Sequence, residues 1–130
     1  MAITKNAGRQ YPLVAEAAIL GGVNVTTVAL SPYEAIDLPP GATITGGFYE
    51  VTTAFTGTGT VAVHVGAVVL GVANDGDALG VFPFAVAGYD IPTTTAADTV
   101  DAVVATATLT DGVGRIVVEY VIANRAHEAN

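Results

Sequence analysis

Apolar and polar residues alternate with a period of two along most of this chain, which is typical of β-strands with one buried face. In "TVAVHV", for example, Val61, Val63 and Val65 share one face and His64 lies on the other. β-Branched residues are abundant, and they pack well on pleated surfaces. The pattern predicts about eight strands, at 13–20, 23–30, 42–55, 60–65, 67–74, 80–86, 98–109 and 115–123. The first, "LVAEAAIL", also fits one or two helical turns.

Glycine and proline separate these segments. Residues 31–41 are predicted to be a connection, because Pro32, Pro39 and Pro40 cannot donate to a strand ladder. "TDGVG" at 110–114 is predicted to be a hairpin turn between the last two strands. Further turns or loops are predicted at 56–59, 74–77 and 87–97.

Turn signals recur every 8 to 12 residues, and this spacing is typical of antiparallel all-β folds. We therefore predict an antiparallel β-sandwich or jelly roll, with the jelly roll favoured. The predicted domain covers 13–130, and 1–12 form an extended N-terminal arm. Gly46–Gly47 predict a bulge or bend inside a strand, and Pro83 places its strand at a sheet edge or at a bulge.

Charge is scarce and one-sided. The chain has a net charge of −8, and only 12% of its residues are charged while 52% are hydrophobic. A protein surface with so few charges promotes association, so we expect other subunits to cover much of it. The acidic balance argues against nucleic-acid binding, which needs a basic footprint. Lys5 and Arg9 precede every acidic residue, and this basic start fits either a frayed terminus or a tether that reaches an acidic groove on a neighbour.

Several kinds of site are not expected. The absence of cysteine rules out disulfides and thiolate ligands. "NDGD" with Gly80 faintly resembles a calcium loop, but Val86 stands where the loop needs a glutamate. We expect no cofactor and no metal. The most apolar run, 61–73, is shorter than the roughly 20 residues of a membrane-spanning helix, and no targeting segment is evident.

Catalytic groups are also sparse. Ser31 is the one serine and has no elbow motif around it, while His64 and His127 are the only histidine bases. Asp98 and Asp101 are three residues apart and therefore point to opposite faces of a strand. We predict that the protein is not an enzyme.

The aromatic residues have no basic neighbours in the sequence, unlike those of nucleic-acid stacking platforms. We therefore assign them to the core or to an interface; they are Phe48, Tyr49, Phe55, Phe82 and Phe84.

Two segments carry a family resemblance: "LPPGATITGGFYEVTTAF" at 38–55 and "DTVDAVVATATLTDGVGRIVVEYVIANRAHE" at 98–128. They resemble small virion structural proteins of tailed bacteriophages, in which a Pro-Gly and Thr-Gly-Gly segment leads into "VTTAF" and the last strand is similar to "GRIVVEY". The resemblance does not extend to 60–97, so cement protein, head-fibre base and tail component all stay open.

The resemblance implies a capsid decoration (cement) protein on the outside of the phage head, assembled in the bacterial cytoplasm. The implied partners are the major capsid protein and other copies of the chain, as a homotrimer, without nucleic acid or membrane. The alternative is a β-sandwich module that binds carbohydrate or a host surface. In that case Tyr33 and Tyr89 are the loop aromatics available for recognition.

The charged residues near the two ends are the candidate capsid or inter-subunit contacts. In the last strand Arg115, Val117, Glu119 and Val121 share a face that is half apolar, which is unusual for a face exposed to water. Arg115 and Glu119 lie roughly 13 Å apart along it, so their partners must come from adjacent strands or subunits. The full candidate set is Lys5, Arg9, Tyr11, Arg115, Glu119 and Arg125.

Overall fold

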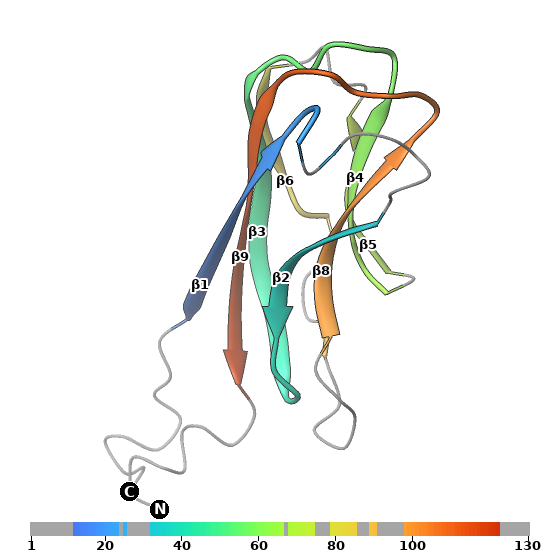
Figure 1. The fold of residues 1–130 in the computed structure, drawn as a ribbon. Coiled ribbons are helices and arrows are strands. Elements are labelled where there is room, and N and C mark those ends of the chain that lie inside the picture. The colour runs from blue at the N-terminus through green and yellow to red at the C-terminus, as the bar shows by residue number, and fades with distance from the viewer. Residues whose placement is uncertain are drawn as a thin grey trace, which may run out of the picture.

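The computed structural model describes residues 12–23, 25, 32–66, 68–74, 79–85, 89–90 and 98–122. These residues form nine β-strands and no helix, and the strands make two antiparallel sheets (Figure 1). The predicted all-β sandwich is confirmed. None of the described segments is a helix that could span a membrane.

The first sheet has the order β1-β9-β3-β6, and a short strand, β7, also pairs with β3. Its strands are β1 (Leu13–Leu20), β9 (Val113–Ile122), β3 (Ala42–Thr53), β6 (Gly80–Pro83) and β7 (Tyr89–Asp90). The second sheet has the order β2-β8-β4-β5. Its strands are β2 (Tyr33–Leu38), β8 (Asp98–Ala105), β4 (Thr60–Val65) and β5 (Val68–Asn74).

The pairing of the strands is nested. β4 pairs with β5, β3 with β6, β2 with β8 and β1 with β9, all antiparallel. Such nesting means that one long hairpin is wound across two sheets, and this is the strand order of a jelly roll. As a result the chain enters β1 and leaves β9 at the same end of the first sheet (Figure 1).

The core lies between the sheets and is built by the alternation seen in the sequence. β4 shows it most simply: Val61, Val63 and Val65 are fully buried and His64 is only half-buried. β9 contributes Ile116 and Val118, as its pattern predicted. The other large, fully buried side chains are Ile19, Val25, Leu38, Ile44, Tyr49, Phe55, Leu70 and Leu109.

The glycine pair in β3 forms the predicted irregularity. The register between β3 and β9 shifts between Ile44 and Gly46. Gly47 has φ +142°, and a Cβ there would lie 2.3 Å from the carbonyl oxygen of Val117. Only glycine fits a backbone that is left-handed and this close to another strand. The predicted edge position of Pro83 is confirmed too, because β6 ends the first sheet.

Two predicted connections are wrong. Residues 31–41 contain β2, because Pro32, Pro39 and Pro40 flank the strand and none lies inside it. The turn at 110–114 does not close a hairpin, because β8 and β9 belong to different sheets. The chain crosses between the sheets here. The backbone N–H of Thr56 donates to the carbonyl oxygen of Asp111, and the N–H of Thr110 donates to the carbonyl oxygen of Thr56.

The other predicted elements differ less from the observed ones. The segment 13–20, which also fitted a helix, is a strand, and the strand expected at 98–109 ends at Ala105, before Thr106 turns to φ 76°. Residues 89–90, expected in a loop, form β7. β1 begins at Leu13, where the predicted arm ends. Residues 1–11 of the arm, 24 and 26–30 of the strand expected at 23–30, and 75–78, which include most of the turn expected at 74–77, lie outside the described residues.

Candidate binding surface

The outer side of the first sheet combines charged and apolar side chains at its centre. We call it the β9 face and define it by Val14 and Glu16 of β1, Phe48 and Glu50 of β3, and Arg115, Val117 and Glu119 of β9. These residues alternate with the core residues of their strands, and the register brings them into three rows across the sheet.

The first row is charged. Arg115 lies opposite Glu50 of β3, and its Nε donates to Glu50 Oε2 at 2.5 Å. Its Nη1 donates to Glu16 Oε1 of β1 at 3.4 Å, and its guanidinium lies 5.5 Å from the centroid of the Phe48 ring. The hydrogen bonds that Arg115 donates to Glu50 and then to Glu16 raise the pKa of Arg115 above its ordinary value. One cation therefore joins three strands, while two carboxylates leave the group with a net negative charge.

The second row is apolar at its centre. Val117 lies between Glu16 of β1 and Phe48 of β3, and it is only 8% exposed although it faces outward. At the margins of the sheet, Val14 is 62% exposed and Val81 is 55% exposed. The predicted half-apolar character of this face is confirmed.

The third row holds an acid that makes no ion pair with the described residues. Glu119 lies opposite Val14 on one side and Gly46 on the other, at the bulge in β3. Its Oε2 is 3.6 Å from the point where a Cβ on Gly46 would stand. Among the described residues Glu119 makes no ion pair, and its side chain is exposed. It is therefore an unneutralised charge close to where β1 begins and β9 ends.

The sequence-predicted contact residues are only partly described. Arg115 and Glu119 lie on one face, as expected, and the partners of Arg115 come from adjacent strands of its own chain. Lys5, Arg9, Tyr11 and Arg125 lie outside the described residues. Glu16, Phe48 and Glu50 could not be assigned to this face from the sequence. Alternation indicates on which side of its own strand a residue lies, but not which residues of other strands lie opposite it.

The second sheet carries a more acidic outer side. Asp101 of β8 lies between Glu34 of β2 and His64 of β4. Partial burial raises the pKa of Asp101, the hydrogen bond from Thr99 Oγ1 lowers it, the charge of Asp98 raises it and that of His64 lowers it. The described residues contain no group of three or more His, Cys, Asp or Glu side chains that could hold a metal ion.

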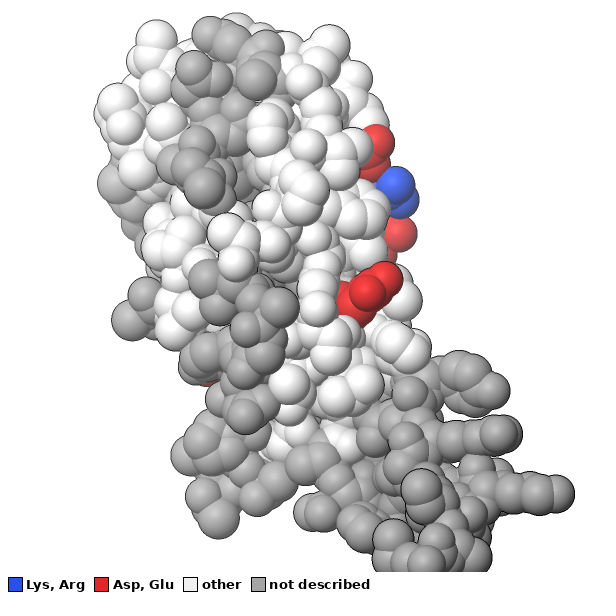
Figure 2. Space-filling model, turned by 180° about the vertical axis from the view of Figure 1, so that it is seen from behind, with Lys and Arg blue, Asp and Glu red and all other residues white. Residues whose placement is uncertain are grey.

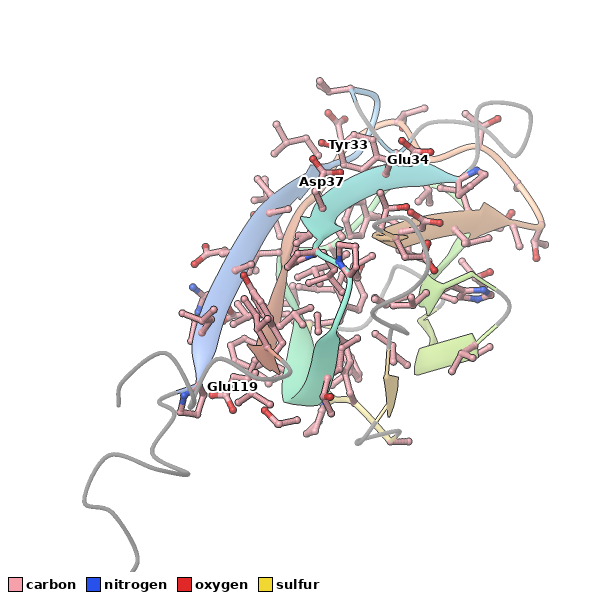
Figure 3. The ribbon with its side chains drawn as sticks, turned by 90° about the horizontal axis from the view of Figure 1, so that it is seen from below. Tyr33, Glu34, Asp37 and Glu119 are labelled. Carbon is pink, nitrogen blue, oxygen red and sulfur yellow. The ribbon has the colours of Figure 1, made fainter. Side chains whose placement is uncertain are left out.

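The two acidic regions are far apart. Figure 3 shows Glu119 on the opposite side of the molecule from Tyr33, Glu34 and Asp37 of β2. Tyr33, expected on a loop, is the first residue of β2 and packs against the core. The side chain of Tyr89 is not among those described.

One core side chain is chemically unusual. Tyr49 is 1% exposed, and its hydroxyl has no hydrogen-bond partner among the described residues. Burial raises the pKa of Tyr49 well above its ordinary range. Of the other aromatics, Phe55 is buried, while Phe82 and Phe84 pack against the core. Phe48 has a basic neighbour after all, because Arg115 reaches it across the sheet.

Comparison with protein-family models, with curated proteins and with solved structures found no match to this chain.

Proposed function

We propose that this chain is a non-enzymatic virion structural protein that binds the outside of a phage head and stabilises the lattice of major capsid proteins. The observation that carries the proposal is the surface. Figure 2 shows the one described basic side chain, Arg115, beside acidic groups on one side, and most of the described surface in that view is uncharged. Large apolar side chains are exposed on both sheets, among them Val14, Val69, Val81 and Val113.

A surface of this kind gains free energy when a partner covers it, because exposed apolar area is transferred out of water. Repeated copies of a capsid lattice offer such cover at many equivalent places. The resemblance of 38–55 and 98–128 to phage virion proteins supports this choice of partner. The jelly-roll strand order is compatible with it, since this fold is used in viral capsids, but a fold alone does not define a function.

The mechanism we propose is mass action. A protein that binds only the assembled lattice stabilises that state by its binding free energy. Contacts with several capsid subunits, or within a homotrimer of this chain, add avidity without any new kind of contact. Lys5, Arg9 and Tyr11 of the arm, together with Arg125, are the proposed contact residues that the described part of the chain does not cover.

Localisation on particles tests this proposal. Virus particles carrying the chain are imaged by electron microscopy, and the number of copies per particle is measured by quantitative mass spectrometry. Copies in the hundreds, spread over the head shell, are expected. A few copies at one vertex or along the tail would reject decoration in favour of a connector or fibre role.

A deletion tests the arm. A chain lacking 1–10 is expected to occupy fewer lattice sites on heads that lack the native protein, while its melting temperature stays within a few degrees of the full chain. The matched control is a full-length chain with Lys5→Gln and Arg9→Gln, which keeps the length but not the charge. Full occupancy by both variants would remove the arm from the mechanism.

A further inference from the structure

The charge of the chain is divided between its middle and its ends. Residues 13–122 hold eleven of the 12 acidic residues and one basic residue, which gives −10. The flanking segments hold Lys5, Arg9 and Arg125 against Glu128, which gives +2, and the two values sum to the net −8 of the chain. The basic segments are therefore complementary to the folded body of the same protein.

The β9 face offers two negative positions at a defined spacing. One is Glu119, which has no ion-pair partner among the described residues. The other is the group of Glu16, Arg115 and Glu50, where two carboxylates share one cation and a net charge of −1 remains. Arg115 and Glu119 are four residues apart on one strand, which is roughly 13 Å. Val117, apolar and nearly covered, lies between them.

The N-terminal segment has the matching pattern. Lys5 and Arg9 are also four residues apart, with Ala7 midway. In an extended chain these three side chains point the same way, and the two cations are roughly 13 Å apart. A cation, a small apolar residue and a cation can thus lie over Glu119, over Val117 and beside the carboxylates of Glu16 and Glu50 that flank Arg115. Residues 1–11 can extend to roughly 36 Å, enough to run the length of the ten-residue β9.

The position of Pro12 bears on whether residues 1–11 bind the β9 face of their own copy or that of a second copy. The segment enters β1 at the end of the sheet, so it must reverse direction within a few residues to lie on its own β9 face. Tyr11 precedes Pro12, and a residue before proline is restricted to extended conformations. This restriction opposes a reversal at Tyr11, and it therefore favours binding to a second copy over binding to the segment's own sheet.

We propose that residues 1–11 of one copy bind across the β9 face of a second copy, with Lys5 and Arg9 over its two negative positions. The contact links copies of the chain to one another, and it does not depend on the capsid proposal. Because the pairs are exposed to water, it weakens as salt screens them.

Zero-length cross-linking tests the proposal directly, because Lys5 is the one lysine of the chain. A 1:1 mixture of unlabelled and ¹⁵N-labelled full-length protein is treated with a carbodiimide, which joins an amine to a carboxylate in contact. Peptides joining Lys5 to Glu119, Glu16 or Glu50 are expected, with mixed isotope labels in about half of them. Lys5→Arg keeps the charge but removes these peptides. Unmixed labels would show that the arm folds on its own copy, and no peptide to these three acids would overturn the proposal.

Charge reversal gives an independent measurement of the same contact. Sedimentation velocity of the isolated full chain at low salt is expected to show self-association that Glu119→Arg weakens roughly tenfold. Asp37→Arg is the matched control, since it makes the same charge change on an exposed strand position of the other sheet. Adding either Lys5→Glu or Arg9→Glu to Glu119→Arg is expected to restore part of the affinity in the case of the one cation that lies over position 119, because the other cation still lies over the second negative position. A monomer at every concentration, or equal weakening by Glu119→Arg and Asp37→Arg, would overturn the proposal. Glu119→Gln serves if the arginine variant fails to fold.

Discussion

Arg115 of β9 donates from Nε to Oε2 of Glu50, the residue directly opposite it on β3, and the same guanidinium reaches Glu16 on β1. A side chain that looks like a free surface cation in the sequence therefore joins three neighbouring strands. Its partners belong to its own chain, and Glu119 is the acid of this face that has no ion-pair partner among the described residues.

Replacing Arg115 with Gln is expected to lower the melting temperature by a few degrees. The substitution removes the cation that Glu16 of β1 and Glu50 of β3 share from either side of β9, so two ion pairs are lost and two negative charges stay on one face. Differential scanning calorimetry measures the change. The difference should shrink in about 1 M NaCl, where the Debye length is about 3 Å. Arg115→Lys, which keeps the charge, should lose less, and equal losses for Lys and Gln would show that charge is not the cause.

The two adjacent glycines of β3 should respond very differently to alanine. Gly47→Ala is expected to cost more than about 2 kcal/mol, because it combines a positive φ with a Cβ placed 2.3 Å from Val117 O. Gly46→Ala is the matched control; the nearest atom to its Cβ is Glu119 Oε2 at 3.6 Å, and the cost should be within about 0.5 kcal/mol. Urea unfolding gives both values, and similar costs at the two positions would contradict the bulge.

Tyr49→Phe is expected to leave stability unchanged or to raise it by about 1 kcal/mol. The hydroxyl is buried without a partner, so its removal ends a desolvation cost and breaks no hydrogen bond. Tyr49→Ala, which also removes the ring from the core, should instead lose about 3–5 kcal/mol. Chemical denaturation measures both changes. A large loss on Tyr49→Phe would reveal a partner for the hydroxyl.

The same residue predicts a loss of stability in alkaline solution. Its pKa in the folded protein is raised above the ordinary value of 10.0 by burial, so near pH 10 the unfolded chain ionises first. The folded state then holds the proton more tightly, and stability is full below pH 10 and falls as the pH rises beyond it. Melting temperatures of the wild type and Tyr49→Phe between about pH 8 and pH 11 should diverge only at the alkaline end. Parallel curves would show that Tyr49 does not titrate differently on folding.

Much of the fold could be predicted because strand alternation is a local property. The period of two in 60–65 identified the buried valines of β4, and the same period separated Ile116 and Val118 from Arg115 and Glu119 in β9. The effects of Gly46–Gly47 and of Pro83 could be predicted equally well. Glycine permits a positive φ and proline lacks a backbone N–H, and both properties are independent of the surroundings. The strand at 33–38 was missed because the flanking prolines outweighed its short alternating pattern.

The candidate surface was predicted only in part. Alternation indicated that Arg115 and Glu119 share a face and are too far apart to pair. It could not supply Glu16, Glu50 or Phe48, which lie 99, 65 and 67 residues away from Arg115 in the chain. Such contacts depend on the register between strands, and register is set by long-range packing and by the shift at the bulge.

The sequence by itself determined the all-β class, the two faces of its clearest strands and the concentration of basic residues near the ends, because these depend on local sterics and composition. The tertiary structure decided which strands are neighbours. It directed the turn at 110–114 across to the other sheet, and it paired Arg115 with acids of its own chain, while Glu119 has no ion pair within the part of the chain that the structure describes. Those outcomes depend on nested pairing between distant segments, which is stabilised by burying two apolar sheet faces against each other and is not encoded in any single stretch of the chain.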